Sequence, residues 1–152
     1  MTDFSVTIEI HAPPERVWAV LRDIERWPDW TPTVTHIQRV DRGPFAVGSR
    51  ARIRQPKLPP AEWQVTELHE GRSFTWVTRY PGLRVTARHG ITADRAGSRA
   101  TLSLQFSGAL GPLVARLTRR LNERYMALEA KGLRERSEAS TGSILPGAPR
   151  ST

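Results

Sequence analysis

The residues of this chain that could carry chemistry are a few polar side chains on the apolar faces of predicted strands. His89 shares its alternation parity with Val85 and Ile91, so we expect it to point to the buried side of its strand. A histidine acts as a general acid or base when its pKa lies near the operating pH and it can reach a substrate proton. The same imidazole can also contact a ligand or form a hydrogen bond within the core, and the sequence leaves these three roles open.

Three other polar residues occupy predicted inward positions on neighbouring strands. Gln55 and Thr78 each continue an apolar set, and Glu67, near the end of its strand, has the parity of the apolar residues before it. Ligand pockets have mostly apolar walls with a few polar groups that fix the orientation of the ligand. We therefore expect Gln55, Thr78 or His89 to orient a polar end, and Glu67 is available as a second acid for catalysis.

The sequence lacks the motifs of several common reactive centres. It has no Gly-rich phosphate loop, no Gly-x-Ser-x-Gly turn, no His-Glu-x-x-His pair and no cysteine. Its four histidines, His11, His36, His69 and His89, are not spaced as metal ligands, whereas zinc takes about four ligands in a tetrahedron. We expect neither a metal site nor a cofactor.

Five tryptophans supply much of the apolar surface. Trp18 has the spacing of a core residue on a short helix, and Trp27 and Trp30 flank a proline where helices are expected to meet the sheet. Trp30 can serve there either as a structural plug or as a pocket wall. Trp63 and Trp76 lie on neighbouring predicted strands with inward parity. An indole presents well over about 100 Å² of apolar surface, so this pair either fills a cavity or lines it.

The elements that would position these residues are mainly short strands. Alternation of apolar and polar residues indicates a half-buried strand, and turn residues such as Pro81-Gly82 separate the alternating segments. Regular short strands joined by tight turns are typical of a meandering antiparallel sheet. The predicted strands cover residues 4–10, 34–40, 50–55, 63–68, 74–79, 84–91 and 100–106.

Two short helices and one long helix complete the prediction. Pro14 suits the first turn of a helix after the first strand, and Asp23 can cap a second short helix that ends at Pro28. Gly111-Pro112 begins the final helix, which would continue to about residue 138. At 1.5 Å per residue this helix would span about 40 Å, long enough to cross the whole sheet.

The long helix carries a stripe of leucines. Leu113, Leu117 and Leu121 recur at helical spacing, and Tyr125 continues the stripe. We expect these side chains to face the sheet and to form, with the alternating strands, the opposing walls of one cavity. In that arrangement, replacing Leu117 with aspartate would place a carboxylate in an apolar wall and destabilise the fold severely.

Length and composition indicate one domain followed by a tail. A chain of 152 residues matches a single domain and can bury a core or a core with a cavity. We assign residues 1–138 to the ligand-binding domain. Residues 139–152 are rich in Ser, Thr, Gly and Pro, and we predict that they form a disordered tail.

The net charge of +8 does not by itself indicate a nucleic-acid partner. Of the 23 basic residues only Lys57 and Lys131 are lysines, and a predominance of arginine is what GC-rich coding produces. The arginines are spread over every predicted element, whereas nucleic-acid binding requires a basic stripe on one face. We expect no nucleic-acid partner.

The N-terminal residues and the apolar content predict where the protein acts. No basic segment followed by an apolar run is visible near the start, and no stretch approaches the ~18 apolar residues of a membrane span. We expect no signal peptide, no transmembrane segment and a cytoplasmic location. The sequence gives no indication of an oligomeric state.

Four short motifs resemble a known family. They are Ala12-Pro-Pro-Glu-Arg-Val-Trp18, Trp27-Pro-Asp-Trp30, Gly71-Arg-Ser-Phe-Thr-Trp76 and Phe106-Ser-Gly108. Over roughly residues 4–136 the chain resembles the START-like (SRPBCC) superfamily, and more narrowly its polyketide cyclase/dehydrase and lipid-transport branch. The resemblance implies a helix-grip fold. It does not identify a ligand, because that superfamily binds sterols, polyketides, hormones and lipids in one scaffold.

Together, the resemblance and the inward-facing pattern predict an α+β helix-grip fold. A curved seven-stranded antiparallel sheet would surround a long C-terminal helix, with two short N-terminal helices. The favoured function is non-catalytic binding of a small hydrophobic ligand, such as a lipid or polyketide-like molecule, between sheet and helix. A cyclase or dehydratase that depends on His89 is one alternative, and an interaction domain whose cavity is filled by tryptophans is another. The predicted ligand contacts are Trp30, Ile53, Gln55, Trp63, Phe74, Trp76, Thr78, His89, Leu104, Phe106, Leu113, Leu117 and Leu121.

Overall fold

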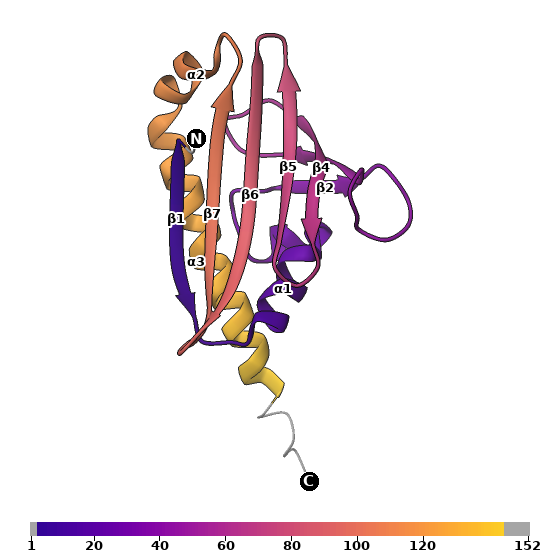
Figure 1. Ribbon diagram of the computed structural model, residues 1–152, viewed down its shortest axis with the longest axis vertical. Coiled ribbons are helices and arrows are strands. Elements are labelled where there is room, and N and C mark those ends of the chain that lie inside the picture. The colour runs from indigo at the N-terminus through magenta and orange to yellow at the C-terminus, as the bar shows by residue number, and fades with distance from the viewer. Residues whose placement is uncertain (1–2, 145–152) are drawn as a thin grey trace.

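The strands form one seven-stranded antiparallel sheet. The computed structural model describes residues 3–144, and its strands are β1 (Phe4–Ile10), β2 (His36–Arg39), β3 (Arg50–Arg54), β4 (Ala61–His69), β5 (Ser73–Tyr80), β6 (Leu83–Asp94) and β7 (Gly97–Ser107). Their order in the sheet is β1-β7-β6-β5-β4-β3-β2 (Figure 1). Strands β2 to β7 pair with their neighbours in the chain, and β1 adds to β7 at the edge. The predicted antiparallel meander is therefore confirmed.

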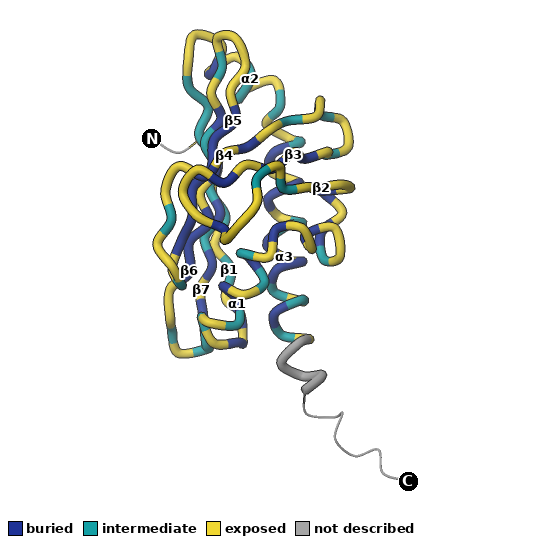
Figure 2. Tube along the Cα trace, turned by 90° about the vertical axis from the view of Figure 1, so that its right-hand side faces the viewer, coloured by how far each residue is buried: buried dark blue, intermediate teal, exposed yellow. Residues whose placement is uncertain are grey.

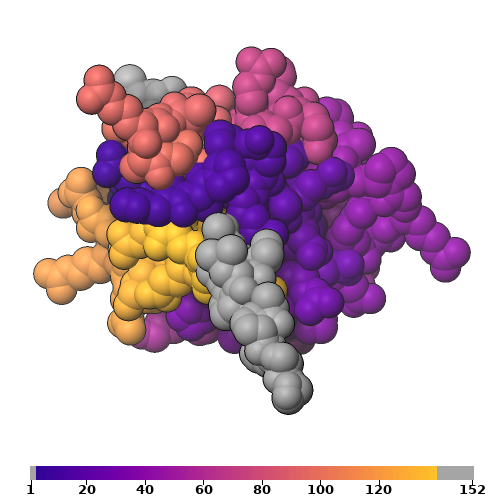
Figure 3. All heavy atoms as spheres, turned by 90° about the horizontal axis from the view of Figure 1, so that it is seen from below, coloured from indigo at the N-terminus to yellow at the C-terminus, as the bar shows by residue number. Residues whose placement is uncertain are grey.

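Four helical segments accompany the sheet. They are α1 (Pro14–Arg22), the 3-10 helix η1 (Ile24–Asp29), α2 (Gly111–Leu117) and α3 (Arg119–Ile144). Helix α3 packs against β1, β7 and α1. The space-filling view shows the yellow part of α3 beside the indigo N-terminal segment (Figure 3). The predicted α+β helix-grip fold, with two short N-terminal helices and a long C-terminal helix, is confirmed.

The C-terminal helix is divided in two, which differs from the single predicted helix. Thr118 lies between α2 and α3 with φ −104° and ψ 13°, and its hydroxyl donates a hydrogen bond of 2.7 Å to the carbonyl of Val114. A threonine that bonds back to the carbonyl four residues earlier commonly bends a helix. The break leaves α2 as a separate short helix over one end of the sheet (Figure 1).

A β-bulge in β4 overturns the predicted position of Glu67. Val65 pairs with Trp76, but Glu67 pairs with Thr75, so the register shifts between Val65 and Glu67. One extra residue in a strand reverses which face the following side chains occupy. Glu67 is therefore exposed and lies 3.5 Å from His69 on the surface, so it is not the predicted inward acid.

Helix α3 also extends beyond the predicted end of the domain. It continues to Ile144, so residues 139–144, which were predicted to belong to the disordered tail, are helical in the structure. Residues 145–152 of that tail lie outside the described part of the chain. Among the described residues, no helix is long and apolar enough to cross a membrane.

Buried hydrophobic side chains form two clusters, and helix α3 contributes to both. Figure 2 shows buried and exposed residues alternating along the strands and along α3, as expected for elements with one packed face. The larger cluster joins α1 and η1 to the inner face of the sheet, and includes Trp18, Trp27, Phe74 and Leu133. The close approach of α3 to η1 depends on Gly132, because a Cβ at that position would collide with the carbonyl oxygen of Trp30.

Candidate ligand-binding cavity

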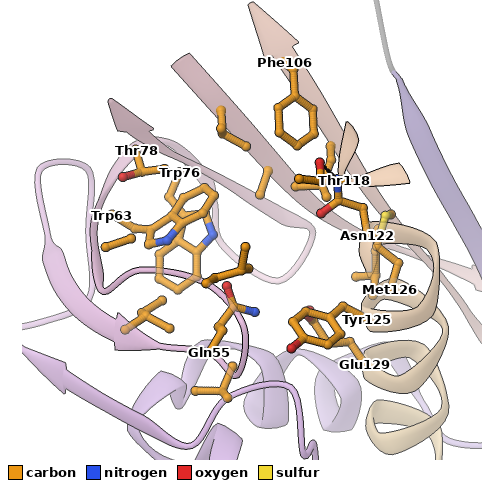
Figure 4. A pocket seen from close by; sticks show the side chains of 18 of the residues that line it. Gln55, Trp63, Trp76, Thr78, Phe106, Thr118, Asn122, Tyr125, Met126 and Glu129 are labelled. Atoms are coloured by element: carbon orange, nitrogen blue, oxygen red, sulfur yellow. Dashed lines mark hydrogen bonds between the residues drawn. The ribbon is translucent and has the colours of Figure 1, made fainter. Parts of the chain in front are cut away.

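A cavity of about 380 Å³ lies between the inner face of the sheet and the C-terminal helices. Pockets for small molecules usually have about 300–1,000 Å³. Side chains from β3 to β7 form one wall, and side chains from α2 and α3 form the other. Figure 4 shows Trp63 and Trp76 on one side and Asn122, Tyr125, Met126 and Glu129 on the helix opposite.

Three indoles line this cavity and leave its centre open. The ring centroids of Trp63 and Trp76 are 5.7 Å apart, and those of Trp27 and Trp76 are 5.3 Å apart. All three are buried, and each borders the cavity. The indole of Trp27 donates a hydrogen bond of 3.0 Å to the carbonyl of Leu21, which fixes its ring. The inward parity of Trp63 and Trp76 is confirmed, and the open alternative of lining or filling is decided in favour of lining.

The predicted role of Trp30 in the cavity is wrong, and Trp27 takes that place. Residues three apart lie on the same side of a 3-10 helix, so η1 buries Ile24 and Trp27 together. The helix ends at Asp29, and the half-buried ring of Trp30 packs over Gly132 of α3, outside the cavity lining. The sequence motif around Pro28 did not show that the helix would end at Asp29 and leave Trp30 beyond it, at φ −129° and ψ −6°.

Phe74 was also predicted to contact the ligand, but it is completely buried behind the cavity wall. Its ring stacks on His89 with centroids 4.4 Å apart and meets Trp76 edge-on at 5.3 Å. Phe74 has the expected parity, but the rings of its neighbours separate it from the cavity. Its contribution is to hold the rings of Trp76 and His89 in place.

Most of the helical residues that line the cavity lie one position after the residues of the predicted leucine stripe. Leu113 and Leu117 are exposed, at 54% and 74%, and Leu121 is absent from the residues that line the cavity. The prediction that these leucines form the wall is wrong. The residues of α2 and α3 that do line the cavity, together with the threonine between the two helices, are Val114, Thr118, Asn122, Tyr125, Met126 and Glu129. Leucine content alone therefore pointed to the wrong face of this helix.

Because Leu117 faces solvent, Leu117→Asp is now expected to be tolerated. The change should alter the free energy of unfolding by no more than about 0.5 kcal/mol, as is usual for surface positions. Urea unfolding of the variant and of the wild type measures the difference. Met126→Asp is the matched comparison, because Met126 is buried on the cavity side of α3 and its replacement should cost several-fold more. Equal losses for both variants would contradict this placement of the helix.

The other predicted contacts do line the cavity. Gln55 and Thr78 supply polar groups on the strand side. Asn122 adds a carboxamide from α3, whose nitrogen donates a 2.8 Å hydrogen bond to the hydroxyl of Thr118. The remaining predicted residues found in the lining are Ile53, Trp63, Trp76, His89, Leu104 and Phe106.

His89 is buried and neutral. Desolvation by burial lowers its pKa to about 4, and a backbone hydrogen bond with Phe74 opposes this shift only in part. Nδ1 is enclosed and has no hydrogen-bond partner among the described residues. An imidazole with this pKa is not in the acidic imidazolium form near pH 7 and is a weak base, so its environment suits a packed wall better than acid–base catalysis.

Glu129 is a site residue that the sequence analysis missed. Its carboxylate oxygen Oε2 accepts a 3.2 Å hydrogen bond from the hydroxyl of Thr33, which lies 2.9 Å from the hydroxyl of Thr31. Desolvation raises the pKa of Glu129 to about 7, and the bond from Thr33 lowers it only in part. The spacing Asn122, Met126, Glu129 places it on the cavity side of α3, a signal that the leucine stripe obscured.

The loop after β3 closes one side of the cavity. The hydroxyl of Tyr125 donates a hydrogen bond to the carbonyl of Pro56, which ties α3 to this loop. Burial raises the pKa of Tyr125, with Arg124 opposing the shift. Leu58 and Pro59 of the same loop line the cavity. Among the described residues, no group of three His, Asp or Glu side chains could hold a metal ion.

Comparison with known protein families identifies one that matches most of the chain. A family model described as polyketide cyclase / dehydrase and lipid transport matches residues 1–138. No curated protein matches the sequence significantly.

Solved structures share the fold over almost the whole chain. A protein of Thermus thermophilus is 22% identical, with a TM-score of 0.72 over 90% of this chain and 97% of its own. The Zhui aromatase/cyclase from a Streptomyces species is 16% identical, with a TM-score of 0.70 over 91% and 94%. A START superfamily protein from Mycobacterium smegmatis is 18% identical, with a TM-score of 0.67 over 90% and 97%. At such identities these similarities establish the fold alone.

Proposed function

Because the chain belongs to the polyketide cyclase/dehydrase and lipid-transport family, we propose that its cavity binds a small hydrophobic molecule without transforming it. The observation that carries this proposal is the cavity of about 380 Å³ between the tryptophans of the sheet and α3. Contact between water and the apolar wall of the cavity is unfavourable. A ligand that displaces this water binds with a favourable free energy that grows with the apolar area it covers.

The polar groups of the lining support binding of a molecule with one polar end. Gln55, Thr78 and Asn122 are separated by apolar side chains, so they can orient a ligand without forming a hydrophilic site. The Trp63 and Trp76 rings provide flat surfaces against which an aliphatic or aromatic body can pack. This arrangement is compatible with a lipid or a polyketide-like molecule.

A binding experiment tests the proposal. Isothermal titration calorimetry with long-chain alcohols, fatty acids, sterols and aromatic polyketides should show saturable binding near one molecule per chain for at least one class. Tryptophan fluorescence should change with the same midpoint, because three indoles line the cavity. The proposal fails if the folded protein binds none of these classes saturably.

A second function, that of a cyclase or dehydratase, is favoured by one observation. Glu129 is a cavity carboxyl with a pKa of about 7, and general acid–base catalysis works best with a pKa near the operating pH. Glu129 is a better candidate for that role than His89, which the sequence alone had favoured. Mass spectrometry of a bound carbonyl substrate decides the matter. A binder returns the molecule unchanged, and an enzyme converts it and loses about 10²-fold or more of its rate in Glu129→Gln.

The cytoplasmic location expected from the sequence stays a prediction. So does the expectation of no nucleic-acid partner, no metal and no cofactor. The open cavity lined by tryptophans is the reason that we propose ligand binding in place of the third function, an interaction domain with a filled cavity.

A further inference from the structure

We propose that the cavity selects apolar molecules whose polar end is a protonated amine, and that the carboxylate of Glu129 holds this amine. The inference rests on the proposed binding function and adds the chemical class of the ligand. Three features of the cavity carry it: a carboxylate without a cationic partner among the described residues, aromatic walls, and the outward direction of Arg88, the other charged residue of the described lining.

The first feature is the incomplete set of contacts around Glu129. Within residues 3–139, the Glu129 carboxylate has no arginine, lysine or histidine nitrogen within 4.0 Å, and Thr33 alone donates a hydrogen bond to it. Thr33 and Thr31 are both buried, and their hydroxyls lie 2.9 Å apart. Since the Thr33 hydroxyl donates to Glu129, its oxygen accepts from Thr31, and this chain fixes one carboxylate oxygen. The other oxygen is left to accept a hydrogen bond from a ligand.

The desolvation of Glu129 makes a cationic partner favourable. A half-buried carboxylate away from compensating charge costs free energy, which is why burial raises its pKa to about 7. A protonated amine placed beside it would restore the missing partner. Hydrogen bonds between an ammonium and a carboxylate are roughly twice as strong as those between neutral groups.

Aromatic walls also favour a cation. Trp27, Trp63, Trp76 and Tyr125 border the cavity, and the face of an aromatic ring carries negative electrostatic potential. A cation within about 6 Å of such a face is attracted, most strongly by tryptophan. The same rings repel an anion, so the wall discriminates between an amine and a carboxylate of equal length.

The other titratable groups around the cavity do not supply a competing charge. His89 is neutral, and the Tyr125 hydroxyl donates to the carbonyl of Pro56. Arg88 contributes to the cavity lining, and its positive charge helps to lower the pKa of His89. The residue is exposed and alternates with inward Ala87 and His89, and its guanidinium lies beside Gly90, so its charged end belongs to the outer face of β6.

Strands β1 and β7 and helix α1, which pack against α3, also carry charged residues, but none of those described forms an ion pair with Glu129. Glu9 of β1 is exposed and lies 3.7 Å from Arg99 of β7. Arg16 and Arg22 of α1 form no ion pair with Glu129, and Arg22 instead lies 2.9 Å from Glu70. Of the two charged residues in the described lining, Arg88 and Glu129, it is therefore Glu129 that presents its charge on the inner side of the sheet.

Three probes of equal chain length test the inference: decylamine, decanol and decanoate. Titration calorimetry at pH 8, where the carboxylate of Glu129 is charged, should show decylamine binding about tenfold more tightly than decanol, and decanoate most weakly. In Glu129→Gln, which keeps the shape of the side chain, the advantage of the amine over the alcohol should disappear. Glu123→Gln is the matched control, because Glu123 is exposed on the same helix and loses the same charge.

The outcomes separate this inference from the function on which it rests. Saturable binding of decanol without an advantage for decylamine overturns the amine preference and leaves the binding function intact. An advantage that survives in Glu129→Gln, or that Glu123→Gln removes equally, also overturns it, since overall charge would then be the cause. Failure of all three probes to bind argues against the binding function itself. The wild-type ranking decides the question even if Glu129→Gln does not fold.

Discussion

Ala87→Trp is expected to weaken ligand binding by about 10–100-fold while the protein stays folded. Ala87 lies on β6 between Trp76 of β5 and Leu104 of β7, and all three residues line the cavity. An indole at this position has open space to enter, so it would occupy the volume that the ligand needs. Overlap of this kind costs about 1–3 kcal/mol or more, and affinity for decanol should fall by about 10–100-fold.

Ala93→Trp is the control for this experiment, because Ala93 is exposed near the end of the same strand. Its affinity for decanol should equal that of the wild type. Near-ultraviolet circular dichroism and urea unfolding report whether each variant keeps its packed core. Full binding by folded Ala87→Trp would show that the cavity between the sheet and α3 is not the binding site.

The stability of the protein is expected to respond to pH through two desolvated groups, Glu129 and His89, whose effects have opposite signs. The pKa of Glu129 is raised from 4.5 to about 7. Between pH 4.5 and pH 7 the native state therefore holds a proton on Glu129 that the unfolded state has lost. Stability from this group is therefore lost as the pH rises through about 4.5 to 7. The pKa of His89 is lowered from 6.5 to about 4, so the unfolded state binds the extra proton. Stability from this group is lost as the pH falls from about 6.5 to 4.

Two variants should separate these opposing contributions. Relative to the wild type, Glu129→Gln should gain stability as the pH rises from 5 to 8. His89→Phe, which keeps a ring stacked on Phe74, should gain stability as the pH falls from 7 to 4.5. One pKa unit corresponds to about 1.4 kcal/mol, so each change should amount to at least about 1 kcal/mol. Urea midpoints measured across this range give both curves. If the urea midpoints of both variants and of the wild type change with pH in the same way, neither Glu129 nor His89 titrates with a shifted pKa.

The sequence by itself determined the sheet and much of its inner surface. Alternation has a period of two along a strand, and turn residues mark the strand ends, so the local pattern is sufficient to predict β3, β5, β6 and β7. The same parity correctly placed Trp63, Trp76 and His89 on the cavity side. These assignments succeeded because hydrogen-bonded neighbours on both sides hold those strands in a regular pleat.

The tertiary structure decided the positions at which the backbone departs from a regular repeat. The bulge after Val65 reversed the face of Glu67, and the end of η1 at Asp29 left Trp30 beyond the helix, so Trp27 lines the cavity and Trp30 does not. A one-residue insertion in a strand or the end of a short helix leaves no mark in an apolar pattern, but it changes the direction of the side chains that follow.

The helical wall of the cavity could be identified only after the chain was folded. A cavity relaxes the demand for apolar side chains on the helix that borders it, so the leucines at 113 and 117 could turn to solvent while Asn122 and Glu129 faced inward. The shifted pKa of Glu129 likewise arises from desolvation by residues distant in sequence and from the hydroxyl of Thr33, 96 positions away. The sequence therefore determined which surface is curved and aromatic. Only the fold determined which carboxylate that surface encloses, because burial is a property of the whole packed chain.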